Sequence, residues 1–233
     1  LFGACSTMAE GLALGAALCE GGAARNLLAM ASSHFCAAER QFRTPLSYGA
    51  VRTPTAQWTA TAAGCCLLQP QGEGVGIAAA TFGRVQDYQV KDINNMGAAM
   101  APAAASTLLH YFKDTGTEPQ EFDCIYTGDL GQVGSQLLRE LLAAEGLLIK
   151  NHVDCGSILF DANEQSVKSG GSGPGCCAAV LCGHILPRLR RGSQKRVLFT
   201  ATGALMSQTT FLQKETIPAV AHLVELRAPE KEK

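Results

Sequence analysis

The chain opens with Leu1-Phe2-Gly3-Ala4-Cys5-Ser6-Thr7, a short apolar lead that runs into a cysteine and then into a stretch of small residues. Thr7 and Glu10 have the spacing of a capping box, which predicts a helix from Thr7 to about Glu20 that stops at Gly21-Gly22. A cysteine at a helix N-terminus lies beside unpaired N–H groups that favour its thiolate. Because the chain holds ten cysteines, spacing alone still favours a structural role for Cys5.

A second segment has the same order of features as the first 30 residues. Moving that segment forward by 171 positions places Cys5 on Cys176, Gly21 on Gly192, Arg25 on Arg196, and Leu27-Leu28 on Leu198-Phe199. Both segments consist of a glycine-containing elbow, a small-residue helix, a basic turn and an apolar strand. A chance match between Gly- and Ala-rich helices is the alternative. A duplication would bring two helix N-termini into one shared crevice.

Strand-like and helix-like segments alternate along the whole chain, which predicts an α/β fold. Besides the first helix, helices are expected at Ala101 to Phe112, Gly134 to Ala144, and from the turn Ser169 to Gly175 up to about Arg190. Strands are expected at Asn26 to Ser33, Trp58 to Gln69, Gly76 to Val85, Phe122 to Thr127, Ser157 to Phe160, and Arg196 to Thr202.

Composition excludes several classes of function. The 233 residues are 47% apolar, enough for a substantial core, and 19 basic against 20 acidic residues leave a net charge of -1. No dense Lys/Arg block is present, so we expect no nucleic-acid partner. The cysteines show no C-x-x-C spacing and the five histidines are scattered, so we expect neither a zinc site nor another metal site. The cysteines are expected to pack as small apolar residues in a reducing compartment.

Two uncharged stretches, Thr53 to Gly72 and Ile93 to Phe112, are long enough to be considered as membrane spans. The first contains Pro and Gln, and most of the apolar content of the second is Ala, so neither is expected to span a bilayer unaided. A peripheral protein is therefore predicted. The first residues lack a starting Met and a basic region, and we expect the chain to be a fragment or a processed product.

Several single residues allow both a functional and a structural interpretation. Asp129, in Gly128-Asp129-Leu130, is a candidate base or a turn residue, and His34 is a candidate pocket residue or a hydrogen-bonded structural histidine. Arg40 and Arg43 are expected on a solvated face. The turn Gly170 to Gly175 lacks the end of a phosphate loop, and is interpreted as a nest of backbone donors in which Pro174 removes one N–H.

These residues resemble a known family. Phe2 to Thr7 is similar to the nucleophile elbow of thiolases and ketoacyl synthases, and the repeated halves resemble the duplication of that fold. The resemblance is closer to the stage V sporulation protein AD family of the thiolase-like superfamily. It rests on Ser32-Ser33-His34, Ala38 to Arg43, Met96 to Ala105, Thr127 to Leu130, Asp154-Cys155-Gly156, Ala201 to Leu205, and Gln213 to Pro218.

The resemblance implies a layered αβαβα sandwich with duplicated halves, from which an N-terminal segment of roughly one hundred residues is missing here. Residues 1–95 would then be the remainder of the first half and residues 96–233 the second half. Ketoacyl synthases carry a His where this chain has Asp129, and an Asn or His at the elbow that here reads Gly171-Ser172-Gly173. We therefore expect no catalytic residue and no enzyme; a Cys-dependent acyltransferase is the alternative.

The same resemblance implies a function in spores. Members are associated with dipicolinic acid (pyridine-2,6-dicarboxylate), free or as its calcium chelate, and with the SpoVA complex that moves it across the spore inner membrane. The implied partners are that ligand and the other SpoVA membrane proteins, with a homodimer expected and no cofactor. Helix N-termini can hold carboxylates. The predicted ligand-binding residues are Cys5, Ser6, Thr7, His34, Asp129, Gly171, Ser172 and Gly173. A purely structural adaptor is the third alternative.

Overall fold

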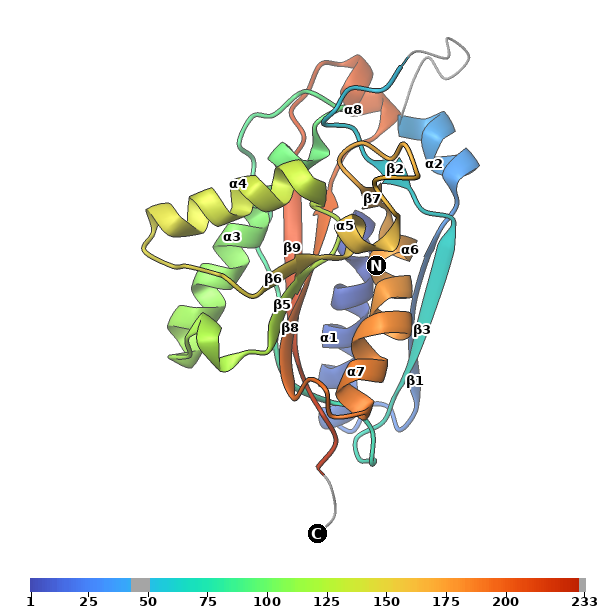
Figure 1. The fold of residues 1–233 in the computed structure, drawn as a ribbon. Coiled ribbons are helices and arrows are strands. Elements are labelled where there is room, and N and C mark those ends of the chain that lie inside the picture. The colour runs from blue at the N-terminus through green and yellow to red at the C-terminus, as the bar shows by residue number, and fades with distance from the viewer. Residues whose placement is uncertain (43–50, 231–233) are drawn as a thin grey trace.

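The computed structural model describes residues 1–42 and 51–230, apart from the side chains of residues 39–42. It confirms the α/β fold class. Figure 1 shows a layered arrangement, with helices on both sides of a five-stranded sheet and a two-stranded sheet beyond the helices on one side.

The helices and strands follow one another along the chain in this order. They are η1 (Ala4–Ser6), α1 (Thr7–Glu20), β1 (Leu27–Ser33), α2 (Phe35–Phe42), β2 (Trp58–Thr59), β3 (Ala62–Leu68), β4 (Gly76–Thr81), α3 (Met96–Thr115), η3 (Pro119–Glu121), β5 (Cys124–Thr127), α4 (Gly131–Ala144), β6 (His152–Asp154), α5 (Cys155–Leu159), β7 (Gly171–Ser172), α6 (Pro174–Val180), the π-helix η4 (Leu181–Ile185), α7 (Leu186–Arg190), β8 (Arg196–Ala204), α8 (Gln208–Leu212) and β9 (Ala219–Arg227).

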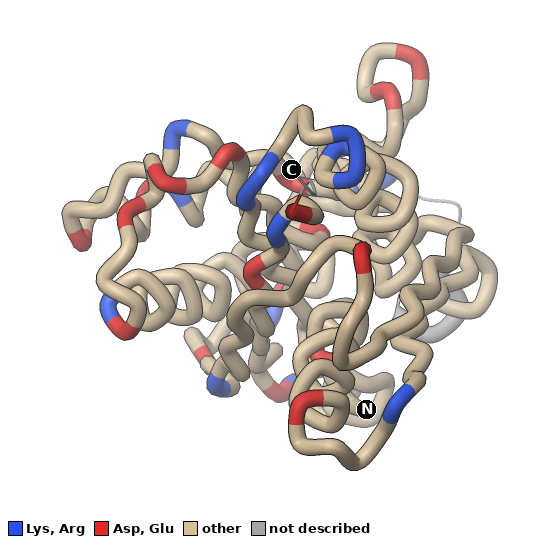
Figure 2. The backbone as a smooth tube through the Cα atoms, turned by 90° about the horizontal axis from the view of Figure 1, so that it is seen from below, with Lys and Arg blue, Asp and Glu red and all other residues tan. Residues whose placement is uncertain are grey.

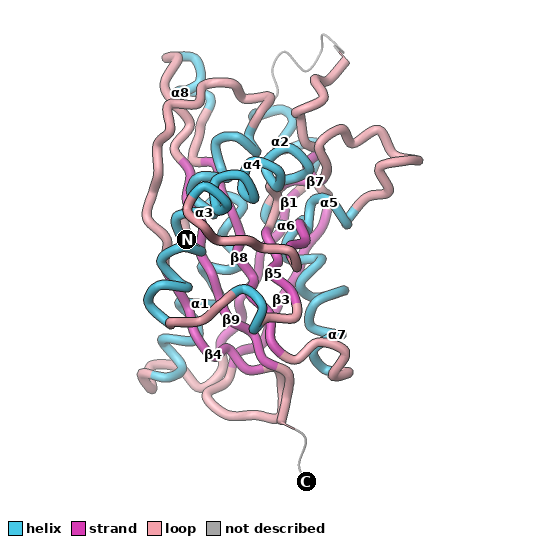
Figure 3. Tube along the Cα trace, turned by 60° about the vertical axis from the view of Figure 1, so that its left-hand side comes forward, coloured by secondary structure: helices cyan, strands magenta, loops and turns pink. Residues whose placement is uncertain are grey.

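The five-stranded sheet has the order β4-β9-β8-β5-β6. β5 runs parallel to β6 and β8, and β9 runs antiparallel to β8 and β4. Alternate side chains of β8 enter opposite cores: Val197 and Phe199 pack with α1 and α6, and Leu198 packs with α3 and α4. Figure 3 shows the strands enclosed between these helical layers. This double burial explains why β8 is an uninterrupted apolar run.

The second sheet contains β1 and β3, which pair antiparallel with Leu28 opposite Leu67 and Met30 opposite Cys65. Its inner face packs on α1 and α6. On its outer face, Leu28, Met30 and Leu67 are 62%, 68% and 59% exposed, and no helix of the described residues covers them. The described chain therefore contains four layers of the expected αβαβα arrangement.

The 171-residue offset agrees with the positions of the elements. It superimposes α1 on the continuous helical stretch from α6 to α7, and β1 on the second part of β8. The division at residue 95 stays a prediction. β4, which precedes that position, pairs with β9 in the five-stranded sheet.

Three predicted elements differ from the structure. Ser157 to Phe160 is helical rather than extended, because the Asp154 side chain accepts a hydrogen bond from Ser157 N at 3.2 Å and begins α5. The predicted strand from Trp58 to Gln69 is two strands with different partners, β7 and β1. α3 begins at Met96, five residues early, because Asn95 caps it and the helix accommodates Pro102. The elements α2, β6, α8 and β9 were not predicted.

Charged residues are mixed along the chain, and basic residues come closest together near the C-terminal end (Figure 2). The densest basic segment spans residues 188–196, where Arg188 contacts His184 and Arg196 pairs with Glu225. Within the described residues, no helix is both long and apolar enough to cross a membrane.

Candidate functional site

The first elbow is a single turn of 3-10 helix, η1, that leads into α1. Ala4 has a φ of 47°, a left-handed conformation that is uncommon for a residue other than glycine. Ser6 is fully buried, and its Oγ donates to Gly3 O at 2.6 Å; Thr7 Oγ1 donates to Ala4 O at 2.6 Å. These two hydroxyl groups stabilise the elbow itself.

The predicted capping box at this elbow is wrong. Thr7 already lies within the first helical turn, and its hydroxyl donates backward instead of accepting a helix N–H. Glu10 Oε2 is buried and makes no hydrogen bond with any described residue. The cause is the 3-10 turn, which starts the helical path three residues before the predicted cap.

The second elbow belongs to β7 and the start of α6. Gly173 precedes α6 with a φ of 100°, and Pro174 is the first helical residue. The N–H groups that follow are occupied: Gly175 N donates to Ser33 Oγ at 3.0 Å, and Cys176 N donates to Gly173 O at 2.9 Å. The predicted nest of free backbone donors is therefore wrong for this turn.

Asp129 lies where the two elbows meet. Its carboxylate, fully buried, accepts hydrogen bonds from Thr202 Oγ1 at 2.8 Å, Ser172 Oγ at 2.9 Å and Gly173 N at 3.1 Å. The Cys5 thiol faces the same carboxylate. Burial raises the pKa of Asp129, and hydrogen bonds from Thr202 and the other donors oppose that rise. The donor groups of Ser172 and Gly173, which the sequence analysis assigned to a ligand, are thus bonded to a carboxylate of the chain itself.

Cys5 is poorly suited to act as a nucleophile in this arrangement. Burial raises the pKa of the Cys5 thiol well above its usual range, and the negative charge of Asp129 is the second cause of this rise. Among the described residues, no histidine forms a hydrogen bond with the Cys5 thiol. Four histidines have other hydrogen-bond partners: His110 bonds to Ser106, His152 to Thr127, His184 to Arg188, and His222 to Gly83. A protonated thiol beside an acceptor carboxylate is not an activated nucleophile.

A second buried carboxylate, Asp154, is bonded to the turn that carries Asp129. It accepts hydrogen bonds from Thr127 Oγ1 at 2.6 Å and from Leu130 N and Gly131 N, both at 2.9 Å. These bonds fix the turn that carries Asp129. Burial raises the pKa of Asp154 to about 7, and the nearby Asp129 contributes to the rise. Asp154 has a positioning role, which sequence reasoning missed although the residue lies in a motif that carries the family resemblance.

Two other residues of this centre were also missed. Gln57, 3% exposed, donates through Nε2 to the backbone carbonyl groups of Asp129 and Gly171 and ties the two turns together. Thr202 reaches Asp129 from β8. Neither carries a sequence signal by itself, since a lone Gln or Thr in an apolar segment has no diagnostic spacing. Only the tertiary structure identifies them.

The other predicted residues lie in different surroundings. Gly171 packs closely against the Phe160 ring. A Cβ atom added at Gly171 would lie only 3.0 Å from that ring. His34 is exposed and precedes α2, and no side-chain hydrogen bond links it to the elbows within the described residues. The side chain of Arg40 and all of Arg43 lie outside the described residues. His34 follows Ser33, whose hydroxyl group accepts a hydrogen bond from Gly175 N, so the second elbow contacts the residue beside His34.

Phe160, whose ring lies beside Gly171, also lines an open cavity of about 460 Å³. We name it the Arg52–Lys168 pocket. Its lining comprises Val51, Arg52, Trp58, Phe160, Gln165, Ser166, Val167 and Lys168. The Arg52 guanidinium carbon lies 4.2 Å from the centre of the Trp58 ring, and that ring stacks on Phe35 at 4.6 Å. The pocket combines aromatic walls with two cationic side chains.

Among the described residues, no group of three or more His, Cys, Asp or Glu could hold a metal ion.

Comparison with known proteins agrees with this architecture. The chain resembles the 3-oxoacyl-[acyl-carrier-protein] synthase III structures from Aquifex aeolicus VF5 (14% identity, TM-score 0.56, 96% of this chain and 65% of that chain) and from Pseudomonas aeruginosa PAO1 (15% identity, TM-score 0.55, 97% of this chain and 66% of that chain). At such identities the likeness shows the thiolase-like fold alone.

Sequence comparison is more specific. The chain is 44% identical over 223 residues to the stage V sporulation protein AD of Bacillus subtilis (strain 168), an alignment that covers 95% of this chain and 66% of that protein. The chain thus spans slightly less than two thirds of the length of this relative. The family model for stage V sporulation protein AD (SpoVAD) matches residues 1–227. The chain belongs to the stage V sporulation protein AD family.

Proposed function

We propose that this chain is a non-catalytic sporulation protein that binds dipicolinic acid. Membership of the stage V sporulation protein AD family supports a role in sporulation. The ligand, its calcium chelate and the SpoVA complex follow from the family resemblance of the sequence. In this proposal the protein is peripheral on the forespore or spore inner membrane, contacts the other SpoVA membrane proteins and helps to move dipicolinate across that membrane.

The environment of Cys5 supports the non-catalytic part of the proposal. Acyl transfer needs a thiolate, a base and donors for the developing oxyanion. Here the thiol faces Asp129, which disfavours the thiolate, and the nearby Ser172 and Gly173 donors are bonded to Asp129. Incubation with acyl-CoA is expected to leave Cys5 unmodified. Acylated Cys5 that turns over would instead support the acyltransferase alternative.

One observation supports the binding part: the Arg52–Lys168 pocket has the chemistry that a flat aromatic dianion requires. Trp58 and Phe160 line the pocket with aromatic carbon atoms that the pyridine can contact, and Arg52 and Lys168 offer positive charge for the two carboxylates. Arg52 is held over Trp58 and is therefore pre-organised. We place the ligand in this pocket, because Asp129 occupies the elbow donors and would repel a second carboxylate.

The test is calorimetric titration of the purified chain with dipicolinate. Arg52→Gln and Lys168→Gln are each expected to weaken binding about tenfold or more, since each removes one charge-assisted contact worth about 1.5–3 kcal/mol. Lys150→Gln is the matched control, because Lys150 is also exposed but does not line this pocket. It should leave the dissociation constant unchanged.

Two results would contradict this placement. If Ser172→Ala removes binding while both pocket variants retain it, the ligand contacts the elbow as the sequence predicted. If the wild-type chain, correctly folded by circular dichroism, takes up no dipicolinate, the structural adaptor becomes the better hypothesis.

A further inference from the structure

Two cysteines lie close together at the contact between β3 and η4, outside the site described above. The Sγ atoms of Cys66 and Cys182 are 3.9 Å apart, although 116 positions separate the residues in sequence. Cys182 Sγ also lies 3.7 Å from Cys65 O. A disulfide has an S–S length of about 2.05 Å, so the two sulfurs need to approach by only about 1.9 Å. A change of side-chain rotamer supplies a movement of this size.

The local backbone favours this approach. Cys182 is the second residue of η4, a π-helix, and such single wide turns often mark functional positions in helices. A Cβ added at Gly183, the next residue, would meet no atom within 4 Å, so there is open space beside Cys182. Cys66 and Cys182 are both partly exposed, whereas Cys176 and Cys177 are fully buried. A small oxidant can therefore reach the pair.

We infer that Cys66 and Cys182 form a redox pair that closes to a disulfide and cross-links β3 to η4. The oxidant is a low-molecular-weight disulfide, RSSR. The Cys182 thiolate attacks one sulfur of RSSR, forms a mixed disulfide and releases one thiolate RS⁻. Cys66, losing its proton, then attacks the Cys182 sulfur and releases the second RS⁻. The released thiolates take up the two protein protons, so RSSR is reduced to two RSH.

The electrostatics of the pair agree with these roles. The hydrogen bond from Cys66 lowers the pKa of Cys182 to about 6 against the effect of burial, and Arg190 nearby also lowers it. Cys182 is thus the attacking thiol and Cys66 the resolving thiol. In a reducing compartment both sulfurs remain reduced, and the disulfide forms when the concentration of low-molecular-weight disulfide rises.

The cross-link would join the small sheet to the helix of the second elbow. η4 continues directly from α6, which begins beside Gly173. β3 already packs tightly on α6, since a Cβ at Gly64 would lie 2.4 Å from Ala178 O. The disulfide would close a loop between residues 116 positions apart, which reduces the conformational freedom of the unfolded chain. We therefore expect oxidation to raise Tm by about 5–10 °C.

The experiment equilibrates the purified chain with mixtures of reduced and oxidised glutathione, quenches with acid and alkylates the free thiols. Peptide mass spectrometry under non-reducing conditions should then reveal a linked Cys66–Cys182 peptide pair that dithiothreitol separates. Cys66→Ser and Cys182→Ser should each lack the link and the rise in Tm. Cys65→Ser is the matched control, because Cys65 is adjacent in β3 but lies on the opposite, exposed face. It should retain the link.

Three outcomes would overturn the inference. One is a chain with native circular dichroism that shows no link even in excess oxidised glutathione. Another is a disulfide of Cys182 that still forms in Cys66→Ser and disappears in Cys65→Ser, which would make Cys65 the partner. The third is a stable mixed disulfide at Cys182 that Cys66 does not resolve.

Discussion

Asp129 is the residue at which the two elbows of the site meet. Its buried carboxylate accepts hydrogen bonds from Thr202, Ser172 and Gly173. The second elbow is therefore bonded to a negatively charged group of the chain itself. A buried carboxylate with several donors is stable in place, but it disfavours a second negative charge beside it. The thiol of Cys5 is the group that this arrangement keeps neutral.

Replacing Asp129 should therefore activate Cys5. Asp129→Asn removes the negative charge and keeps the shape of the side chain, so the pKa of Cys5 should fall and its alkylation by iodoacetamide at pH 8 should become about tenfold faster for each pKa unit. Peptide mass spectrometry measures this rate for Cys5 alone. Asp123→Asn is the control, because Asp123 is exposed and bonds to the backbone of Lys195 and Arg196.

An unchanged Cys5 rate in a correctly folded Asp129→Asn chain would show that burial alone suppresses the thiol. That result would remove the electrostatic part of the explanation.

At the scale of elements, the start of α6 depends on a glycine. Gly173 has a φ of 100°, its N–H donates to Asp129, and a Cβ there would lie 2.8 Å from Ser33 Oγ. Bulk at this position therefore disturbs the fold itself. A loss of ligand binding in Gly173→Val would not report on ligand contact.

We expect Gly173→Ala to lower the free energy of unfolding by about 1–3 kcal/mol. Gly183→Ala, in the same helical stretch but with open space around it, should leave stability unchanged or raise it by up to about 1 kcal/mol. Urea denaturation of both variants provides the comparison. Equal stability of the two would contradict the strained role of Gly173.

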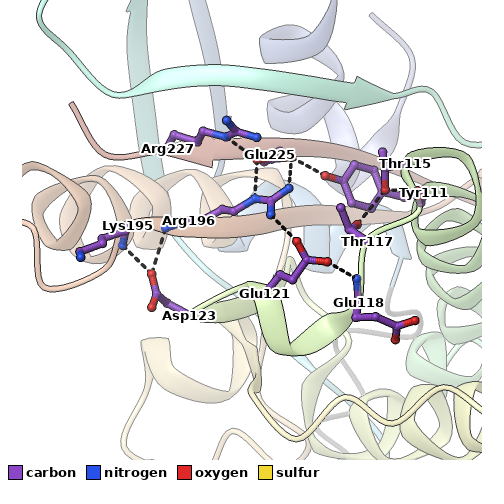
Figure 4. Close-up of polar contacts among 10 residues, drawn as sticks. All are labelled: Tyr111, Thr115, Thr117, Glu118, Glu121, Asp123, Lys195, Arg196, Glu225 and Arg227. Atoms are coloured by element: carbon purple, nitrogen blue, oxygen red, sulfur yellow. Dashed lines mark hydrogen bonds and ion pairs between the residues drawn. The ribbon is translucent and has the colours of Figure 1, made fainter. Parts of the chain in front are cut away.

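An ionic network around one buried carboxylate connects three elements at the other end of the large sheet (Figure 4). Glu225 on β9 is 2% exposed and pairs with Arg196 Nε on β8 at 2.8 Å and with Arg227 Nε at 2.6 Å. Tyr111 on α3 donates to its other oxygen. Burial alone would raise the pKa of Glu225, but the bonds from Arg196, Tyr111 and Arg227 outweigh it and lower that pKa to about 2.

The network should make stability depend on pH in a defined direction. Because the folded pKa of Glu225 lies below its unfolded value, its contribution is complete above about pH 4.5 and is lost as the pH falls toward 2. Glu225→Gln should cost about 3 kcal/mol at pH 7 and progressively less in acid. Glu121→Gln, which removes a half-exposed partner of Arg196, should cost less than about 1 kcal/mol. A Glu225→Gln cost that is independent of pH would contradict the assignment.

At the scale of the whole molecule, the uncovered face of the small sheet is the clearest feature. Leu28, Met30 and Leu67 form an apolar, exposed patch on paired strands, and such patches promote association. The expected homodimer remains a prediction.

We expect the wild-type chain to associate as its concentration rises, and the double variant Met30→Lys with Leu67→Lys to associate less, as measured by light scattering coupled to size-exclusion chromatography. Leu212→Lys, at an exposed leucine on α8, is the control and should behave like the wild type. Association that the double variant leaves unchanged would indicate a different contact surface.

The sequence predicted the elements whose signals are local. The small-residue helix after Cys5 and the apolar run of β8 carry their periodicity within one segment, and the glycine turns mark their ends. Asp154, in contrast, converts a strand-like segment into α5 through one side-chain hydrogen bond. The split between β2 and β3 depends on two different partner strands. Neither effect is visible in local propensity.

For the site, contiguous motifs in the sequence determined the family and the two elbows, and the family resemblance implied that Asp129 faces Cys5. Only the tertiary structure decided what those groups do. It brings Asp129, Ser172, Gly173 and Thr202 within hydrogen-bond distance from separate segments of the chain, and the buried carboxylate takes the donors that appear free in the sequence. The reason is physical: a buried polar group must find a partner, and the chain supplies it from residues distant in sequence.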